Sequence, residues 1–443
     1  MTWEFVSPAS VRAAVDQLVL FRGVVANPAG QAFVRLMEAL AQNRPEPRAV
    51  WEAYGELFRL LAAEVELGDE TPAGDPWLNF VLDRILDDDN PFSRKAAAAD
   101  LAEMGPSLRA QAGEDLRRLQ ALTRWDGPAV RRVVAAATGA EPVGWDDLRP
   151  LGTAGREDPL TAARSAFKRR LVAARDWAEA IPDLALHYRT HGTGAFGRYR
   201  AFRWDSSGIV PVRHPDPVRL ADLPGYERQH KLLLDNTARF VRGLPAHNAL
   251  LFGPAGTGKS SAVKAVAHEL AGQGLRLVEI DRNALDQLPV AVQALAERNN
   301  RFLVFIDDLS FEEHETGYKS LKACLEGSAA ARPANVLVYA TSNRRHLVRQ
   351  RVSERPGADS DELHPQDAMA EKLSLSDRFG LRIAFFPPDQ DRYLKMVETL
   401  VRRANLAVDP DELRRRALAW EREHGGRSGR TVRRFVDELR AGS

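Results

Sequence analysis

The spacing of apolar positions along the chain changes near residue 192. Before it, valines and leucines recur every three or four residues between breaks at proline and glycine, as at Leu116, Leu119 and Leu122. This spacing is typical of amphipathic helices that bury one face. Helices are predicted at 10–22, 31–42, 50–65, 76–87, 114–125 and 161–180. Since no fixed-period repeat stands out, an all-helical N-terminal domain is favoured over a solenoid.

Beyond residue 224, short apolar runs alternate with helical patterns. The runs have the apolar character of buried strands and lie at 248–252, 275–281, 302–308, 335–343 and 381–386. Helical patterns lie at 226–242, 261–270 and 290–298. Five strands that alternate with helices predict a mostly parallel, five-stranded sheet covered on both faces. The helical pattern that begins at residue 389 predicts a small lid.

These patterns divide the chain into four segments. We expect a helical N-terminal domain at 1–190, a basic and aromatic connector with a proline-rich linker at 191–224, an α/β domain at 225–388 and a helical lid at 389–443. The length of 443 residues suits two or three domains. A hydrophobic content of 44% and a charged content of 28% are ordinary for a globular protein.

Composition mainly excludes certain classes of protein and site. The formal net charge of +1 gives no overall attraction to nucleic acid or membranes, so any such surface has to be local. Cys324 is the only cysteine, which excludes an intrachain disulfide and a cysteine zinc cluster. The N-terminus lacks a signal-peptide pattern, and no apolar run approaches the ~20 residues that span a bilayer. We therefore expect a cytoplasmic protein without membrane contact.

Two local clusters each admit two interpretations. The carboxylates of Asp87, Asp88 and Asp89 could bind a metal, but a solvated helix end is favoured because no further ligands lie nearby in sequence. Between 187 and 204, arginines alternate with aromatic residues, a pattern that suits bound phosphates and stacked bases. A connector whose aromatic residues pack between domains is favoured there, because no nucleic-acid-binding motif accompanies the pattern.

The most informative motif is a glycine loop that reads Gly-Pro-Ala-Gly-Thr-Gly-Lys-Ser, between a predicted strand and a predicted helix. Glycines let the backbone approach a phosphate, whose charge then faces backbone N–H groups and the helix N-terminus. In such a loop Lys259 reaches the β- and γ-phosphates and Ser260 binds Mg²⁺. The alternative, a glycine turn with a solvated lysine, is disfavoured because both flanks match. The expected phosphate cradle comprises Gly253, Pro254, Ala255, Gly256, Thr257, Gly258, Lys259, Ser260 and Ser261.

A second motif ends the strand at 302–308 with two carboxylates, Asp307 and Asp308. Open α/β sheets bind ligands at the carboxyl ends of their strands, and this end follows the glycine loop by about 50 residues. We expect Asp307 to hold Mg²⁺ beside Ser260. Asp308 is expected to orient or deprotonate the water that attacks the γ-phosphate of ATP.

With both motifs, the C-terminal half resembles an AAA+ ATPase, in which 253–260 is the Walker A motif and 303–308 is the Walker B motif. The second Walker B carboxylate is usually Glu, so the shorter Asp308 leaves the hydrolysis rate open. More specific strings, such as Gly-Tyr-Glu-Arg-Gln at 225 and Ala-Thr-Ser-Asn-Arg-Arg-His-Leu at 340, resemble a bacterial AAA+ family carried as a domain of unknown function. This resemblance runs from about residue 187 to the C-terminus and implies an α/β P-loop NTPase core.

The resemblance also implies further site residues. Asn343 matches the sensor 1 position near the γ-phosphate, and capping of a following helix is its alternative role. Arg378 matches the arginine finger that completes a neighbouring subunit's site, with an intrachain salt bridge as the alternative. In the lid, Arg430 is preferred over Arg427 as the sensor 2 residue, and a solvated basic helix start is the alternative.

The leading hypothesis is an ATPase that uses Mg²⁺ and ATP, assembles as a ring homo-oligomer such as a hexamer, and moves an unidentified protein client. Protein threading is disfavoured because the segment 281–289 lacks the aromatic pore residue of ring unfoldases. A nucleic-acid-associated loader or slow ATP-dependent switch is the second hypothesis, favoured by the paired aspartates and by the arginines around Arg198 and Arg430. A scaffold that binds nucleotide without turnover is the third.

Overall fold

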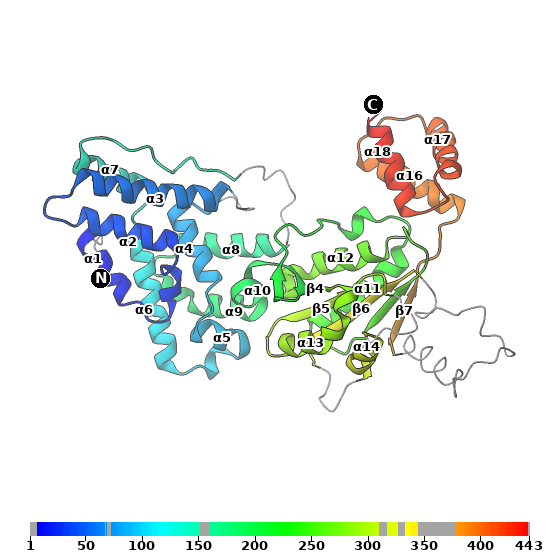
Figure 1. The fold of residues 1–443 in the computed structure, drawn as a ribbon, viewed down its shortest axis with the longest axis horizontal. Helices are drawn as coiled ribbons and strands as arrows, with labels where there is room; N and C mark the ends of the chain where they lie inside the picture. The colour runs from blue at the N-terminus through cyan, green and yellow to red at the C-terminus, as the bar shows by residue number, and fades with distance from the viewer. Residues whose placement is uncertain are drawn as a thin grey trace. The chain divides into compact units, whose positions relative to one another are not determined.

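The computed structural model of the chain describes residues 7–66, 68, 72–150, 159–309, 317–326, 333–343 and 378–441. The chain divides into two compact units, Met1–Arg198 and Tyr199–Ser443. Figure 1 shows that the first unit contains helices and the second a sheet with helices on both faces.

Helices make up all the regular structure described in the first unit. Many begin with proline, whose missing N–H is no loss in the first turn and whose fixed φ suits a helix. They are α1 (Pro8–Asp16), η1 (Phe21–Val24), α2 (Pro28–Leu40), α3 (Pro47–Glu66), α4 (Pro76–Leu86), α5 (Pro91–Ala98), η2 (Leu101–Glu103), α6 (Pro106–Leu122), α7 (Gly127–Thr138), α8 (Pro159–Ala173), η3 (Trp177–Ala180), α9 (Ile181–His191) and α10 (Gly194–Arg198).

The core of the first unit follows the predicted apolar stripes. Leu116, Leu119 and Leu122 of α6 are fully buried, which confirms the stripe read from their spacing. Trp77 of α4 stacks on Phe33 of α2 with 4.1 Å between ring centroids. Its indole N–H donates to the Leu122 carbonyl at 3.2 Å, so the polar edge of this buried ring is satisfied.

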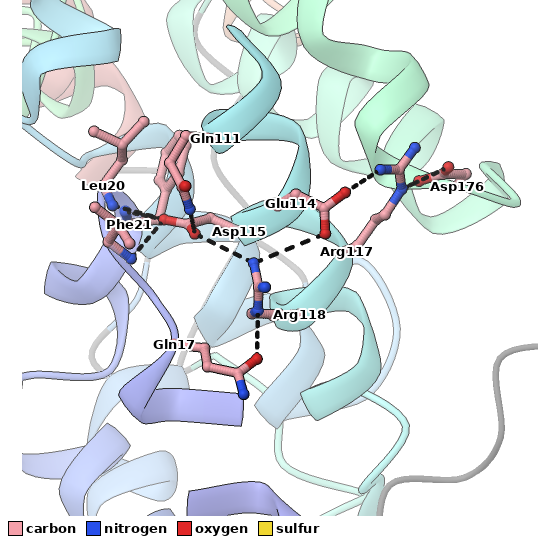
Figure 2. A network of polar contacts seen from close by, with 10 residues as sticks. Gln17, Leu20, Phe21, Gln111, Glu114, Asp115, Arg117, Arg118 and Asp176 are labelled. Carbon is pink, nitrogen blue, oxygen red and sulfur yellow. Dashed lines mark hydrogen bonds and ion pairs between the residues drawn. The ribbon is translucent and has the colours of Figure 1, made fainter. Parts of the chain in front are cut away.

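A buried carboxylate joins α6 to the turn between α1 and η1 (Figure 2). Asp115 Oδ2 accepts the backbone N–H groups of Leu20 at 2.6 Å and Phe21 at 3.0 Å. The other oxygen accepts from Gln111 Nε2 at 2.8 Å. These N–H groups lie outside the regular hydrogen bonding of a helix, so they need another acceptor. The Asp115 carboxylate supplies it.

Asp87, the first carboxylate of the acidic run at 87–89, belongs to a network of ion pairs. Asp87 pairs with the buried Arg164 at 2.7 Å, and Arg164 also pairs with Asp83 at 2.9 Å. Lys168, likewise buried, lies 2.6 Å from Asp83. Among the residues that the structure describes, no group of three or more His, Cys, Asp or Glu side chains could hold a metal ion. The carboxylates of Asp83 and Asp87 thus compensate buried cations, which would otherwise be costly.

The described strands of the second unit form one seven-stranded sheet, in the order β2-β1-β4-β5-β6-β3-β7. Only β1 and β2 pair in antiparallel fashion, and the other pairs are parallel. The strands are β1 (Ala201–Asp205), β2 (Gly208–Pro211), β3 (Ala249–Phe252), β4 (Leu275–Ile280), β5 (Arg301–Ile306), β6 (Val336–Ser342) and β7 (Leu381–Ala384). All five predicted runs are strands.

The predicted count of five strands was wrong, because β1 and β2 come from the segment expected to be a connector. In β1, Phe202 and Trp204 are buried whereas Arg203 between them is exposed. The alternation of arginine and aromatic residues at this point is therefore the two-residue period of a strand. Asp205 pairs with Gly208, whose φ of 101° suits the tight turn between the strands.

Helices cover the sheet, and the last three follow β7 as a C-terminal helical segment, which is called the lid below. The described helices of this unit are η4 (Leu220–Asp222), α11 (Glu227–Val241), α12 (Lys259–Leu270), η5 (Ala271–Gln273), η6 (Arg282–Gln287), α13 (Leu288–Ala296), α14 (Gly317–Glu326), α16 (Gln390–Arg403), α17 (Pro410–Glu423) and α18 (Gly429–Ala441). Across the described helices of both units, none is long and apolar enough to cross a membrane.

Strand register brings three distant segments to one edge of the sheet. Phe252 of β3 pairs with Ser342 of β6, and Ile306 of β5 pairs with Ala340 of β6, all in parallel. The residues that follow these strands therefore all lie at the carboxyl ends of the strands. Open α/β sheets bind ligands at these carboxyl ends.

Candidate functional site

The loop between β3 and α12 has a backbone that only glycine fits at its first position. Gly253 has φ 145°, and a Cβ atom there would lie 2.0 Å from the carbonyl oxygen of Phe385. Gly256 and Gly258 also have positive φ, and α12 begins directly afterwards at Lys259. The loop and the first turn of α12 line a pocket of about 510 Å³. A glycine loop that leads into a helix N-terminus can hold a phosphate group.

Lys259 joins this loop to the end of β6. Its Nζ donates to the carbonyls of Gly253 at 2.7 Å and Pro254 at 2.9 Å, and to Asn343 Oδ1 at 2.9 Å. Burial lowers the pKa of the Lys259 ammonium, while Asp307 and Asp308 oppose the shift. An anionic phosphate in the pocket would favour the charged ammonium further.

Two carboxylates after β5 face the same pocket. Asp307 Oδ1 accepts the hydroxyl of Ser260 at 2.5 Å, so the first carboxylate touches the first turn of α12. Asp308 Oδ1 accepts from Asn343 Nδ2 at 2.6 Å. Asn343 therefore contacts both Lys259 and Asp308 with one amide group. All these side chains line the pocket.

The lid supplies a third side of the pocket. The backbone N–H of Arg430 donates to the carbonyl of Gly256 at 3.1 Å, and the Arg430 side chain lines the pocket. By contrast, Arg427 forms an ion pair with Glu421 at 3.1 Å and donates to Gln390 at 3.3 Å within the lid. The geometry places Arg430 beside the loop and Arg427 among lid residues.

Sequence reasoning overlooked two further arginines in the pocket. Arg433 and Arg434 of α18 line it together with Arg430. Residues three and four positions apart lie on one helix face, so their spacing was the available signal.

A further part of the pocket lining, called the apolar end below, is largely apolar and was also missed as part of the site. It is lined by Leu223, Pro224 and Tyr226 from the segment before α11, by His230 of α11, and by Met396 and Leu400 of the lid helix α16. Gly225 has φ 94°, and a Cβ atom there would lie 2.6 Å from Met396 Sδ. Burial lowers the pKa of His230 to about 4, so this imidazole is neutral at physiological pH. The string Gly-Tyr-Glu-Arg-Gln at 225 was the sequence signal for this end.

A family model described as a protein of unknown function, DUF815, matches residues 197–443, which is more than half of the chain. The chain belongs to the DUF815 family. The matched segment of this DUF815 protein includes the glycine loop, the carboxylates and the lid.

Solved structures of other proteins align with part of the chain. The RuvB Holliday junction branch migration motor of Thermotoga maritima is 18% identical, with 51% of this chain and 65% of that chain covered and a TM-score of 0.35. The ORC1 protein of Aeropyrum pernix, solved in complex with DNA, is 16% identical, with 50% and 65% covered and a TM-score of 0.34. The alignments span less than two thirds of those chains.

The second unit of this DUF815 protein has an α/β fold with the strand, glycine loop and helix arrangement of a P-loop. A mostly parallel sheet carries a glycine loop between β3 and α12, and the two aspartates follow β5 two strands away. The all-helical first unit precedes it in the chain.

Arg378 lies apart from the pocket of its own chain. It is exposed and precedes β7 by three residues. Leu381 pairs with Ala249 in parallel register, so β7 begins beside the amino end of β3. The glycine loop follows the carboxyl end of β3, on the opposite side of the sheet. Arg378 is not among the described residues that line the pocket. In a DUF815 monomer, the structure therefore does not bring Arg378 together with Lys259 and Asp308.

Proposed function

We propose that this protein binds Mg²⁺-ATP in the pocket and hydrolyses the bond to the γ-phosphate. The observation that carries the proposal is the bridge formed by Asn343, whose amide contacts Lys259 and Asp308 at once. A phosphate-binding ammonium and a carboxylate that can act on water thus lie on either side of one side chain. Phosphoryl transfer needs these groups because its catalysis rests on positioning and charge stabilisation.

In this proposal, the phosphates lie against the glycine loop. Lys259 exchanges its bonds to the carbonyls of Gly253 and Pro254 for bonds to phosphate oxygens. Asp308 orients the attacking water and accepts its proton, and Asn343 holds that water and the γ-phosphate. Arg430 approaches the phosphates from the lid, so its guanidinium stabilises the negative charge of the transferring γ-phosphoryl group.

The donor atoms at the proposed metal position suit Mg²⁺. Ser260 Oγ and Asp307 Oδ1 are hard oxygen atoms 2.5 Å apart in the pocket wall. Mg²⁺ commonly takes one or two such protein ligands and completes its shell with water and phosphate oxygens. When bound, it neutralises charge on the phosphates.

The apolar end of the pocket would hold the base of ATP. Leu223, Pro224 and Met396 supply flat apolar contacts, and Tyr226 is fixed by its hydroxyl, which donates to the Phe386 carbonyl at 2.8 Å. His230 is neutral there and can exchange a hydrogen bond with a base edge without adding charge.

The first test measures phosphate release from ATP by the full chain. Activity should disappear in Lys259→Ala, and Asp308→Asn should lower it by roughly 10²-fold or more while ATP still binds. Binding without release in the wild type would instead support a scaffold, and no ATP binding at all would overturn the proposal.

For Arg378 we propose a role in a second copy of the chain, since its position excludes it from its own pocket. Arg378→Ala should bind ATP but hydrolyse it poorly. Mixing it with Asp308→Asn should restore part of the activity, because a mixed ring pairs an intact pocket with an intact Arg378. No recovery, with subunit exchange shown independently, would contradict a role in trans.

The nucleic-acid alternative now depends on the lid. Phe202 and Trp204 are buried, so these aromatic residues are not available to stack on bases. The lid helix α17 instead carries three consecutive exposed arginines, Arg414, Arg415 and Arg416. A DNA-binding assay titrated with salt tests this alternative, because phosphate contacts weaken steeply as salt rises. No binding at low salt would remove it.

A further inference from the structure

Thr341 is a buried residue near the end of β6, two positions before Asn343, and it lies in the string at 340 without a predicted role of its own. It is 1% exposed. Its hydroxyl donates to Asp307 Oδ1 at 2.5 Å and accepts the backbone N–H of Asp308 at 2.9 Å. The hydroxyl therefore donates to one of the paired aspartates and accepts from the backbone of the other.

The main chain of Thr341 holds the same turn. Its carbonyl accepts the N–H of Leu309 at 2.6 Å, so one residue of β6 bonds the three consecutive positions after β5. The register of β5 and β6 brings Thr341 beside this turn, since Ile306 pairs with Ala340.

This turn contains a backbone conformation that aspartate seldom adopts. Asp308 has φ 52°, and Asn405 is the only other non-glycine residue with positive φ among those that the structure describes. Such a conformation is disfavoured and persists where the surroundings impose it. The bonds from Thr341 to the Asp308 N–H and to the Leu309 N–H flank the residue on both sides.

The conformation matters for the direction of the Asp308 side chain. In it, the Asp308 carboxylate meets Asn343 at 2.6 Å and lines the pocket. Without the hydroxyl of Thr341, the Asp308 N–H would keep only its longer bond of 3.1 Å to Asp307 Oδ1. Asp307 would then lose one of the donors that fix its carboxylate beside Ser260.

We propose that Thr341 is a positioning residue, whose hydroxyl fixes Asp307 for Mg²⁺ and Asp308 for the attacking water. The inference rests on the proposed ATPase function. Thr341 is among the residues that line the pocket but is only 1% exposed, so its hydroxyl is assigned a role through the two aspartates rather than through contact with ATP. The inference predicts that the hydroxyl, rather than the shape of the side chain, determines turnover.

The test compares Thr341→Val, which keeps the shape and removes the hydroxyl, with Thr341→Ser, which keeps the hydroxyl. Thr341→Val should lower kcat by roughly 10- to 100-fold, as expected for a lost hydrogen bond to a charged group, with KM for ATP changed less than threefold. Thr341→Ser should stay within about threefold of the wild type.

Thr237→Val is a matched control in the same unit. Thr237 is fully buried, and its hydroxyl bonds to the Leu233 carbonyl and to the Tyr339 hydroxyl, both at 2.7 Å, away from the pocket. It should lower thermal stability about as much as Thr341→Val but leave kcat within about twofold. If Thr341→Val does not fold, Thr341→Cys, whose thiol is only a weak donor, replaces it.

A second measurement does not depend on turnover. Binding of a fluorescent ATP analogue is followed while Mg²⁺ is titrated. Thr341→Val should need roughly tenfold more Mg²⁺ for half of the metal-dependent gain in affinity, with metal-free binding unchanged. Thr237→Val should match the wild type.

The outcomes separate this inference from the proposed function. A wild type that binds no ATP overturns both. If the wild type binds Mg²⁺-ATP, then a Thr341→Val protein with the kcat and Mg²⁺ dependence of Thr237→Val overturns the inference alone. A Thr341→Ser protein as impaired as Thr341→Val also overturns it, because the hydroxyl would then not be the determinant. In a wild type without turnover, the Mg²⁺ titration alone decides the inference.

Discussion

Asp88 lies after α4 in the first unit, where its carboxylate is packed against the backbone at Gly23. A Cβ atom on Gly23 would lie 2.6 Å from Asp88 Oδ1, so there is little room for water on that side. Burial raises the pKa of Asp88 from 3.8 to about 6, and the charges of Asp89 and Asp115 add to the shift, although a hydrogen bond from Asn90 opposes it. We predict that Asp88→Asn stabilises the first unit at neutral pH.

The sign and size follow from proton linkage. Between pH 3.8 and about 6 the folded state binds more protons at Asp88 than the unfolded state, so stability falls as pH rises through this window. A difference of about two pKa units corresponds to roughly 3 kcal/mol as an upper bound above pH 6. Asn removes this loss and can still accept the bond from Asn90 Nδ2, which is 2.6 Å long in the wild type.

Urea unfolding followed by tryptophan fluorescence measures the effect. Six of the eight tryptophans belong to the first unit, so the signal reports mainly on it: Trp3, Trp51, Trp77, Trp125, Trp145 and Trp177. The stability difference between Asp88→Asn and wild type should be small at pH 4 and grow by about 1–3 kcal/mol up to pH 7. Asp89→Asn, a change at an exposed surface pair with Arg94, is the control and should stay within about 1 kcal/mol. Parallel pH profiles of Asp88→Asn and wild type would refute the reasoning.

Three further predictions address other parts of the chain. Asp115→Ala should cost the first unit roughly 2–5 kcal/mol in urea unfolding, because it leaves backbone N–H groups without an acceptor, and a cost below 1 kcal/mol would show that the turn rearranges freely. Gly253→Ala should lower affinity for a fluorescent ATP analogue at least tenfold with the circular dichroism spectrum unchanged, since its Cβ would overlap the Phe385 carbonyl; unchanged affinity would contradict the described loop. Arg430→Ala should weaken ATP binding by roughly tenfold whereas Arg427→Ala should not, and equal losses would contradict their separate positions.

The sequence predicted the five strands from β3 to β7 because buried parallel strands are continuous apolar runs. The run at 248–252 corresponds to β3, and the run at 381–386 contains β7. It did not predict β1 and β2, because both are short and the exposed Arg203 interrupts the apolar pattern. Such an alternation forms a strand only where a neighbouring strand is available for pairing. For β1 that neighbour is β4, more than 70 residues further along the chain.

The site residues likewise divide into those that local sequence predicts and those that depend on the pairing of distant segments. The glycine loop, Lys259 and Ser260 are contiguous, so their chemistry can be predicted from local spacing. The proximity of Asp307 to Ser260 was expected from the rule that ligands bind at the carboxyl ends of the strands, although the two strands are not adjacent in the sheet. The role of Thr341, by contrast, depends on the register of β5 and β6. Spacing alone does not contain that register, which the packed sheet determines.

Arg430 and Arg427 show most clearly what packing adds. Both lie in one short basic string, and neither spacing nor charge distinguishes them. The backbone N–H of Arg430 donates to Gly256, which docks the first turn of α18 on the glycine loop whatever side chain stands at 430. The ion pair with Glu421 meanwhile holds Arg427 inside the lid. Because docking uses the backbone and charge uses the side chain, Arg430→Ala should remove one guanidinium from the pocket, where Arg433 and Arg434 remain, and leave the lid docked. Any loss of ATP affinity in that variant then measures the guanidinium rather than the closure of the lid.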